Sequence, residues 1–219
     1  MNVSTPSQPQ QEPDLQSEVQ RGRTAAPRRR ERFSPAEYAL LGLLAIERSG
    51  VGGAIEAGVH GYDLGRRFQD GPLAEIIRLE PGMLYHYLKK LAKAGYLTTS
   101  IEHQSSRPDR QDHALTANGQ RVLETWLKEP VHATRDIRLE FLLKLYFARQ
   151  ITSDQARALV REQHDVIAAL VDSLAGQRDA LDDDLHDEGM RRIVLDLRIA
   201  QTEAVLGWLD ALPEAPSER

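Results

Sequence analysis

The chain has 219 residues, a formal net charge of −5 and no cysteine. The lack of cysteine excludes disulfides, thiolate zinc sites and cysteine nucleophiles. The N-terminus has no apolar signal segment, and the longest apolar run, residues 38–46, is too short to cross a bilayer. These features predict a cytoplasmic protein without a membrane partner, built from one large domain or two small ones.

Charge is distributed unevenly along the chain. Residues 1–32 have a net charge of +2, residues 33–129 of −1 and residues 130–219 of −6. Any surface that binds a polyanion is therefore expected upstream of the last third. Residues 1–32 contain few apolar side chains and are predicted to be disordered. Their basic end, residues 28–32, is either an arm that contacts a nucleic-acid backbone or a solubilising tail.

The first helix signals follow this segment. Residues 34–37 (SPAE) combine a serine N-cap, a proline at the first helical position and a glutamate three residues after the cap. They predict a mostly buried helix through residues 38–46. Residues 49–59 contain four glycines and are predicted to form a loop. A second helix is expected over residues 60–68, because Leu64 and Phe68 lie one turn apart.

Residues 80–96 (EPGMLYHYLKKLAKAGY) predict a third helix, with a proline in its first turn and a glycine near its end. Leu84, Leu88 and Leu91 share one apolar side. The remaining surface carries hydrogen-bonding and cationic groups: Tyr85, His86, Lys89, Lys90 and Lys93. Such a helix is held on one face and offers cations on the other.

The next segment predicts a hairpin followed by a helix. Residues 97–103 read as a strand, residues 105–110 as a turn with two arginines, and residues 111–115 as the returning strand. Thr116 caps a helix that ends near Lys128. The order helix, helix, helix, strand, basic turn, strand, helix predicts a winged helix-turn-helix domain over residues 33–130.

Residues 131–212 are helical by pattern, and residues 213–219 are predicted to form a disordered tail. Residues 152–155 (TSDQ) cap a long helix, and a last helix follows the acidic residues 182–188. Two long amphipathic helices cannot bury both of their apolar stripes with so few other segments to pack against, so we expect a second copy of the chain to cover them. The side chains expected at this dimer contact are Leu170, Leu174, Ile193, Leu197, Ala200, Ala204 and Trp208. The predicted fold class is mainly α with a small β-hairpin wing, in which an N-terminal winged helix-turn-helix domain precedes a C-terminal antiparallel helical dimerisation domain.

Seven motifs, in order, carry a resemblance to a known family: LGLL at 41–44, HGYDL at 60–64, PGMLY at 81–85, LKKL at 88–91, AGYL at 94–97, LTANG at 115–119, and FLLKLYFA at 141–148. Over residues 36–212 the chain resembles the PadR-like family of bacterial transcriptional regulators. The resemblance implies a homodimer that binds an operator in double-stranded DNA, acts as a repressor, and responds to a small-molecule effector or stress signal. It departs from the family's usual pattern at Glu80, where a small cap is common, and at residues 112–114, where aromatic residues are common.

The expected DNA contacts lie on the third helix and the wing: Gly82, Met83, Tyr85, His86, Lys89, Lys90, Arg107 and Arg110. Gly82 leaves room for a phosphate at first-turn amides, and the lysines supply charge without forked base recognition. Phosphate contacts are therefore expected to dominate affinity. The alternatives are that Tyr85 packs against the second helix and that the lysines form a solvated face.

Other constellations are weaker. His103 and His113 facing each other across the wing would suggest a metal pair, but a third ligand at metal spacing is missing. The acidic residues 182–188 lack calcium-loop spacing and are expected to form a solvated turn. Trp208 either lines an effector pocket or packs in an interface. No catalytic, cofactor or metal site is predicted, and the rival function is a winged-helix module that binds protein instead of DNA.

Overall fold

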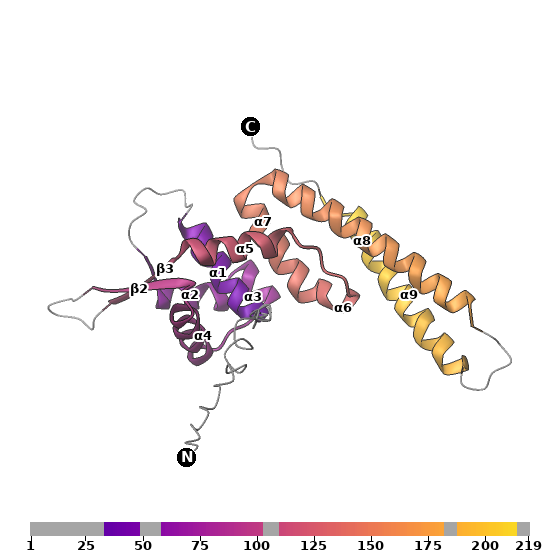
Figure 1. The fold of residues 1–219 in the computed structure, drawn as a ribbon, viewed down its shortest axis with the longest axis horizontal. Coiled ribbons are helices and arrows are strands. Elements are labelled where there is room, and N and C mark those ends of the chain that lie inside the picture. Colours follow the sequence, from indigo (N-terminus) through magenta and orange to yellow (C-terminus); the bar gives the residue numbers. More distant parts are fainter. Residues whose placement is uncertain (1–32, 49–57, 103–109, 182–187, 214–219) are drawn as a thin grey trace, which may run out of the picture. The chain divides into compact units, whose positions relative to one another are not determined.

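The computed structural model describes residues 33–48, 58–102, 110–181 and 188–213 (Figure 1). These residues are mostly helical and include one small antiparallel sheet, which confirms the predicted fold class. No helix among them is both long and apolar enough to pass through a lipid bilayer. The elements are α1 (Pro35–Arg48), β1 (Val59–His60), α2 (Gly61–Gln69), α3 (Pro72–Ile76), α4 (Pro81–Lys93), β2 (Leu97–Glu102), β3 (Arg110–Leu115), α5 (Ala117–Lys128), α6 (Thr134–Asp136), the π-helical turn η1 (Ile137–Phe141), α7 (Leu142–Ile151), α8 (Ser153–Asp179) and α9 (Glu188–Asp210).

Helix α1 begins with the predicted capping box. The Ser34 amide donates to Glu37 Oε2 at 2.8 Å, and the Glu37 amide donates to Ser34 Oγ at 3.3 Å. Helix α1 is then buried along most of its length and contacts α4, α5, α7 and β3. A side chain at Gly42 would meet the Phe147 ring at 2.6 Å, so glycine allows α7 to lie directly against α1.

The sheet has one strand more than predicted. Val59 and His60 form β1, which pairs antiparallel with β3 and gives the strand order β1-β3-β2. The prediction that Val59 belongs to a loop was therefore wrong, because a two-residue strand carries no alternation that a sequence pattern can reveal. The β2–β3 register places Thr99 opposite His113. His113 therefore pairs with Thr99, and His103, the other member of the histidine pair considered from the sequence, lies outside the described residues.

Helix α7 joins two hydrophobic clusters. Its Leu143 and Phe147 belong to the core of α1, α2, α4 and α5, whereas its Leu145 and Ala148 pack with α8 and the end of α9. The predicted domain boundary near residue 130 thus lies between segments that pack together, and residues 33–219 form one compact unit. A movement of α8 and α9 would reach the first core through α7.

Helices α8 and α9 pack along each other, and α8 is tied back to the linker after α5 (Figure 1). Buried Gln163 accepts from the Val131 amide and donates to the Val131 carbonyl, both at 2.8 Å. Thr134 and Thr202 hydroxyls are 3.0 Å apart where α6 meets α9. These bonds satisfy buried polar groups and tie α8 and α9 to the segment that follows α5.

Candidate DNA-binding surface

Helix α4 is held by its apolar side. Leu84, Leu88 and Leu91 are buried, and α4 contacts α1, α2 and β2. Pro81 stands in the first turn, and the N-cap residue Glu80 makes no side-chain capping bond. Because the leucines fix the rotation of the helix about its axis, the side chains opposite them face away from the core.

The first turn of α4 leaves open space beside its backbone. A side chain added at Gly82 would meet no atom within 4 Å. The Met83 amide donates to the Glu80 carbonyl at 3.0 Å, whereas the position of Gly82 in the first turn leaves its amide without an acceptor inside the helix. An anion can therefore approach the Gly82 amide closely, although the exposed Glu80 carboxylate lies at the same end.

Tyr85 packs against α2 and remains partly exposed. Its ring lies against α2, where a side chain at Gly61 would come within 2.9 Å of Tyr85 Cε1. About half of Tyr85 is nevertheless exposed, and Tyr62 beside Gly61 is more exposed still. Tyr85 thus packs on α2, as the alternative expected, and its ring is still accessible from outside. Tyr62 was not among the predicted contacts, and the signal that could have found it is a large aromatic residue outside the apolar pattern of α2.

The predicted cations of α4 lie in different environments. Lys90 Nζ is 2.7 Å from Glu37 Oε1, and the Glu37 side chain is only 2% exposed against 57% for Lys90. Lys89 is exposed and has no ion-pair partner among the described residues. Lys93 is also exposed, and it shares the outward side of α4 with His86 and Lys89. The structure therefore brings His86, Lys89 and Lys93 together and directs Lys90 toward α1.

The Glu37–Lys90 pair is expected to stabilise the fold. Burial alone would raise the pKa of Glu37, but hydrogen bonds from Lys90 and Ser34 outweigh it and leave the pKa below its usual value. Replacing Lys90 with methionine should lower the free energy of unfolding by about 1–3 kcal/mol, because it leaves a buried carboxylate without its cation. The measurement is urea denaturation of the wild type and K90M.

The matched variant is the double substitution E37Q/K90M. Glutamine keeps the capping geometry with Ser34 but carries no charge, so the double variant should recover part of the lost stability. A K90M variant as stable as the wild type would show that this ion pair contributes nothing to the fold.

The wing is described along its strands but not at its tip. Arg107 lies outside the described residues, and for Arg110 only the backbone position in β3 is described. At the base of the wing, His60 Nδ1 lies 3.0 Å from the Gln111 carbonyl, and Thr116 Oγ1 accepts from the Gly119 amide, as predicted for the cap of α5. The base of the wing is thus fixed to both α2 and α5.

His113 makes the sheet sensitive to acid. Burial lowers its pKa below 6.5, Asp112 opposes that shift, and His60 adds to it. His113 Nδ1 is 3.0 Å from Thr99 Oγ1, while its Nε2 is buried without a partner among the described residues. Protonation would place a charge at this buried nitrogen.

Stability should therefore fall as the pH drops below about 6.5, since the unfolded histidine then takes up a proton that the folded one does not. One such group lowers the free energy of unfolding by up to about 1.4 kcal/mol per pH unit. Chemical denaturation between pH 7.5 and 5 should show a shallower loss for H113N than for the wild type. Parallel curves would contradict this role for His113.

Helix α9 leaves an apolar stripe uncovered. Leu195, Ile199 and Leu209 are buried in the chain itself. The predicted dimer residues of α9 are all exposed, among them Ile193 at 62% and Leu197 at 58%; the others are Ala200, Ala204 and Trp208. This stripe is available to a second copy.

The predicted dimer residues of α8 lie differently. Leu174 is buried and Leu170 is partly buried, and both belong to the cluster that α8 forms with α9 of the same chain. Their contacts within one chain already account for their apolar character. They have little surface left to offer a second copy.

The two tryptophans hold different junctions. Trp126 is buried, stacks on Tyr38 with ring centroids 4.3 Å apart, and donates from Nε1 to Glu140 Oε1 at 3.0 Å. Trp208 packs edge-on against Phe141, with centroids 6.1 Å apart. Trp126 is therefore part of the junction between α1, α5 and η1. The contact of Trp208 with Phe141 agrees with the alternative in which Trp208 has a packing role.

Comparison with known proteins matches both halves of the chain. Residues 53–125 match the model of the transcriptional regulator PadR-like family, and residues 137–215 match the model named virulence activator alpha C-term. The negative transcriptional regulator PadR of Bacillus subtilis (strain 168) is 28% identical over 145 residues, which cover 66% of this chain and 74% of that protein.

Two solved structures are among those to which the chain is similar. Bacillus subtilis PadR in complex with operator DNA is 24% identical, covers 81% of this chain and 96% of its own, and has a TM-score of 0.40. The complex of that protein with p-coumaric acid is 25% identical with the same coverage and a TM-score of 0.36. Residues 53–125, which include α2, α3, α4 and most of α5, thus match the PadR-like family of transcriptional regulators, and the chain is similar to the PadR relative over 66% of its length.

Proposed function

We propose that this chain is a sequence-specific DNA-binding repressor that acts as a homodimer on a pseudo-palindromic operator. The observation that carries the proposal is the outward side of α4, where His86, Lys89 and Lys93 are exposed beside the open first turn at Gly82. An exposed helix of this kind next to an antiparallel wing matches the docking geometry of winged helices in the major groove. The name of the curated relative, a negative regulator, supports repression rather than activation.

Among the predicted DNA contacts, the proposal keeps Gly82, Met83, Tyr85, His86 and Lys89 on α4, and Arg107 and Arg110 on the wing. Lys90 is assigned a smaller part, because it is paired with Glu37. Tyr62 on α2 and Lys93 on α4 are added to these contacts, because both side chains are exposed. With no arginine on α4, phosphate contacts supply most of the affinity, and DNA shape supplies part of the specificity.

The remaining parts of the proposal concern assembly and setting. The exposed α9 stripe pairs two copies, and the dimer sets the distance between the two α4 helices. A small-molecule effector stabilises a dimer state with the wrong spacing and so weakens DNA binding. The protein acts in the cytoplasm at the nucleoid and carries out no catalysis.

The direct test is a titration of the full chain against the DNA upstream of its own gene, with a shuffled duplex of equal composition as control, at several salt concentrations. The expected result is a saturable complex with preference for the upstream DNA and an affinity that falls as salt rises. Equal binding to both duplexes, or none, would instead favour the rival function of a winged-helix module that binds protein.

A further inference from the structure

Lys144 on α7 and Gln163 on α8 are fully buried polar side chains that belong neither to the proposed DNA contacts nor to the α9 stripe. Both reach the same short stretch of backbone, residues 129–131, which leads from α5 into the C-terminal helices. A buried cation or amide destabilises the fold unless it is paired. What these two side chains bind therefore explains why they are buried.

Lys144 binds the end of α5. Its Nζ donates to the carbonyl of Glu129, the C-cap residue of α5, at 2.5 Å. The same Nζ lies 3.2 Å from Glu140 Oε1 and 5.2 Å from the centroid of the Trp126 ring. The last carbonyls of a helix have no partner inside the helix and carry partial negative charge, so a cation is favourable at this position. Lys144 thus fixes the end of α5 to α7.

Gln163 binds the residue two positions further along. It accepts a hydrogen bond from the Val131 amide and donates one to the Val131 carbonyl, both at 2.8 Å. Pro130, between the two bound residues, has a fixed φ angle and no N–H group. Residues 129–131 are therefore held from α7 at one end and from α8 at the other, and we call them, with Lys144 and Gln163, the latch.

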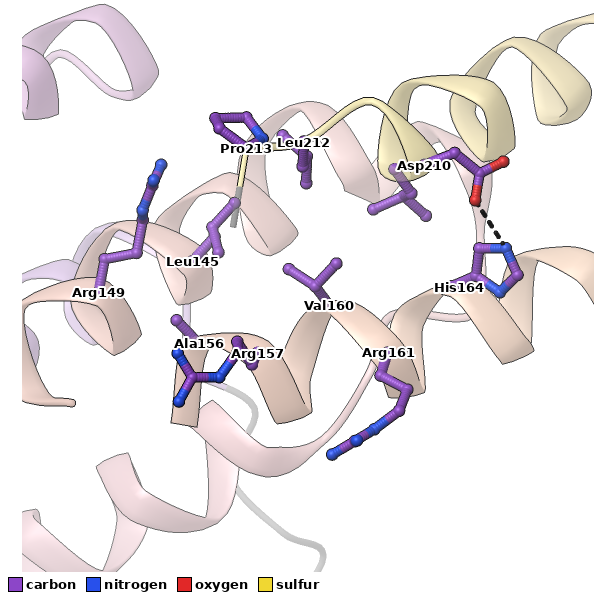
Figure 2. Close-up of a pocket in the computed structure, with 11 residues that line it drawn as sticks. Leu145, Arg149, Ala156, Arg157, Val160, Arg161, His164, Asp210, Leu212 and Pro213 are labelled. Carbon is purple, nitrogen blue, oxygen red and sulfur yellow. Dashed lines mark ion pairs between the residues drawn. The ribbon is translucent and has the colours of Figure 1, made fainter. Parts of the chain in front are cut away.

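The part of α8 that carries Gln163 is also joined to α9. The next residue, His164, lies with its Nε2 3.1 Å from Oδ1 of Asp210 at the end of α9 (Figure 2). Helix α9 carries the exposed apolar stripe around Leu197. Polar contacts thus lead from the end of α5, through residues 129–131 and α8, to the helix proposed to pair two copies.

The latch lies where the chain passes from one hydrophobic cluster to the other. Leu127 belongs to the cluster that holds α4, whereas Val131 belongs to the cluster of α7, α8 and the end of α9. Apolar packing is non-directional, while satisfied buried hydrogen bonds select one arrangement of the groups that they join. The latch is therefore suited to fix how the two clusters are oriented.

We propose that Lys144 and Gln163 are positioning residues for DNA binding, which lock residues 129–131 and so set the orientation of α4 relative to the α9 stripe. The inference rests on the proposed function, because this orientation sets the distance between two DNA-reading helices only in a dimer on its operator. Neither side chain contacts DNA in this account. Their effect is on which spacing of half-sites the dimer accepts.

The test compares binding to the upstream operator DNA and to the same duplex with one base pair inserted at its centre. The insertion moves the half-sites apart by about 3.4 Å and turns them by about 34°. A wild-type dimer with a locked latch should bind the inserted duplex at least about tenfold more weakly. K144M and Q163M keep the length of the side chains but remove the groups that bind the backbone, and should reduce this ratio to about threefold or less.

The ratio separates positioning from folding, because a variant that is partly unfolded loses affinity for both duplexes by the same factor. The matched controls are K128M, on the exposed last turn of α5, and Q155M, in the first turn of α8. They make the same two replacements outside the latch and should keep the wild-type ratio.

Hydrogen exchange measures the latch in the absence of DNA. The Val131 amide should exchange at least about tenfold faster in Q163M than in the wild type, since it loses its acceptor. K144M should accelerate the same amide, because release of residue 129 loosens the stretch that Gln163 holds. Wild-type exchange at Val131 in both variants would overturn the latch itself.

The DNA measurements separate this inference from the proposed function. Specific binding by a wild type that accepts both duplexes equally would overturn the positioning role, and a wild-type ratio in either variant would remove that residue from it. If the wild type binds no specific DNA, the proposed repressor function fails, and faster exchange at Val131 in both variants would still support the latch.

Discussion

Replacing Leu197 with aspartate is expected to convert the homodimer into a monomer. Leu197 lies in the middle of the exposed apolar stripe of α9, which runs from Ile193 to Trp208. In a symmetric dimer one substitution places two carboxylates in the contact, where each loses its water without gaining a partner. The dissociation constant of the dimer should rise by at least about a hundredfold. Light scattering across a concentration series measures the change.

The matched control is R198D, which adds a carboxylate to the adjacent exposed position outside the stripe. It should remain dimeric, because Arg198 is displaced around the helix from the line of Ile193 and Leu197. If L197D stays dimeric at the concentrations where the wild type is dimeric, the α9 stripe is not the contact between copies. The circular dichroism spectrum of L197D at low temperature should match that of the wild type, since Leu197 contributes little to the core of the single chain.

Replacing Lys89 with glutamate is the second change with a large expected effect. Lys89 is an exposed cation on the outward side of α4 with no ion-pair partner among the described residues. Its reversal replaces attraction to a phosphate by repulsion at both half-sites of a dimer. Affinity for the upstream DNA should drop by at least about tenfold at near-physiological salt. Fluorescence anisotropy with labelled duplex measures the loss.

The control is K128E, the same charge reversal on the last turn of α5. Lys128 is exposed on a helix other than α4, and its reversal should change DNA affinity much less than K89E. A milder variant, K89Q, should lower the slope of log affinity against log salt by about 1.8, which is two phosphate contacts per dimer. Equal losses for K89E and K128E would mean that overall charge, not α4, determines binding.

Periodicity and caps predicted the main elements because they are local signals. The Ser34 and Thr116 caps and the leucine spacing of residues 84–91 each depend on residues within a few positions of one another. The strand β1 was missed, since its two residues are defined only by pairing with β3 far along the chain. Contacts between distant segments leave no such local pattern.

The same limit applies to the surface. The sequence placed Lys89 and Lys90 together as outward cations, but Lys90 reaches Glu37, which was read only as part of a cap. The apolar stripe of α9 was found from spacing, whereas its separation from the buried stripe around Leu195 depends on how α8 lies against α9. The contact of Gln163 with the chain after α5 could not be predicted, because its partner lies 32 residues away.

The central claim, that two α4 helices of a dimer occupy successive major grooves, is tested most directly by hydroxyl-radical footprinting on the upstream DNA. The expected result is two protected patches with centres about 10 base pairs apart, related by a pseudo-palindrome and lost together in K89E. A single protected patch, or protection that K89E leaves intact, would contradict it.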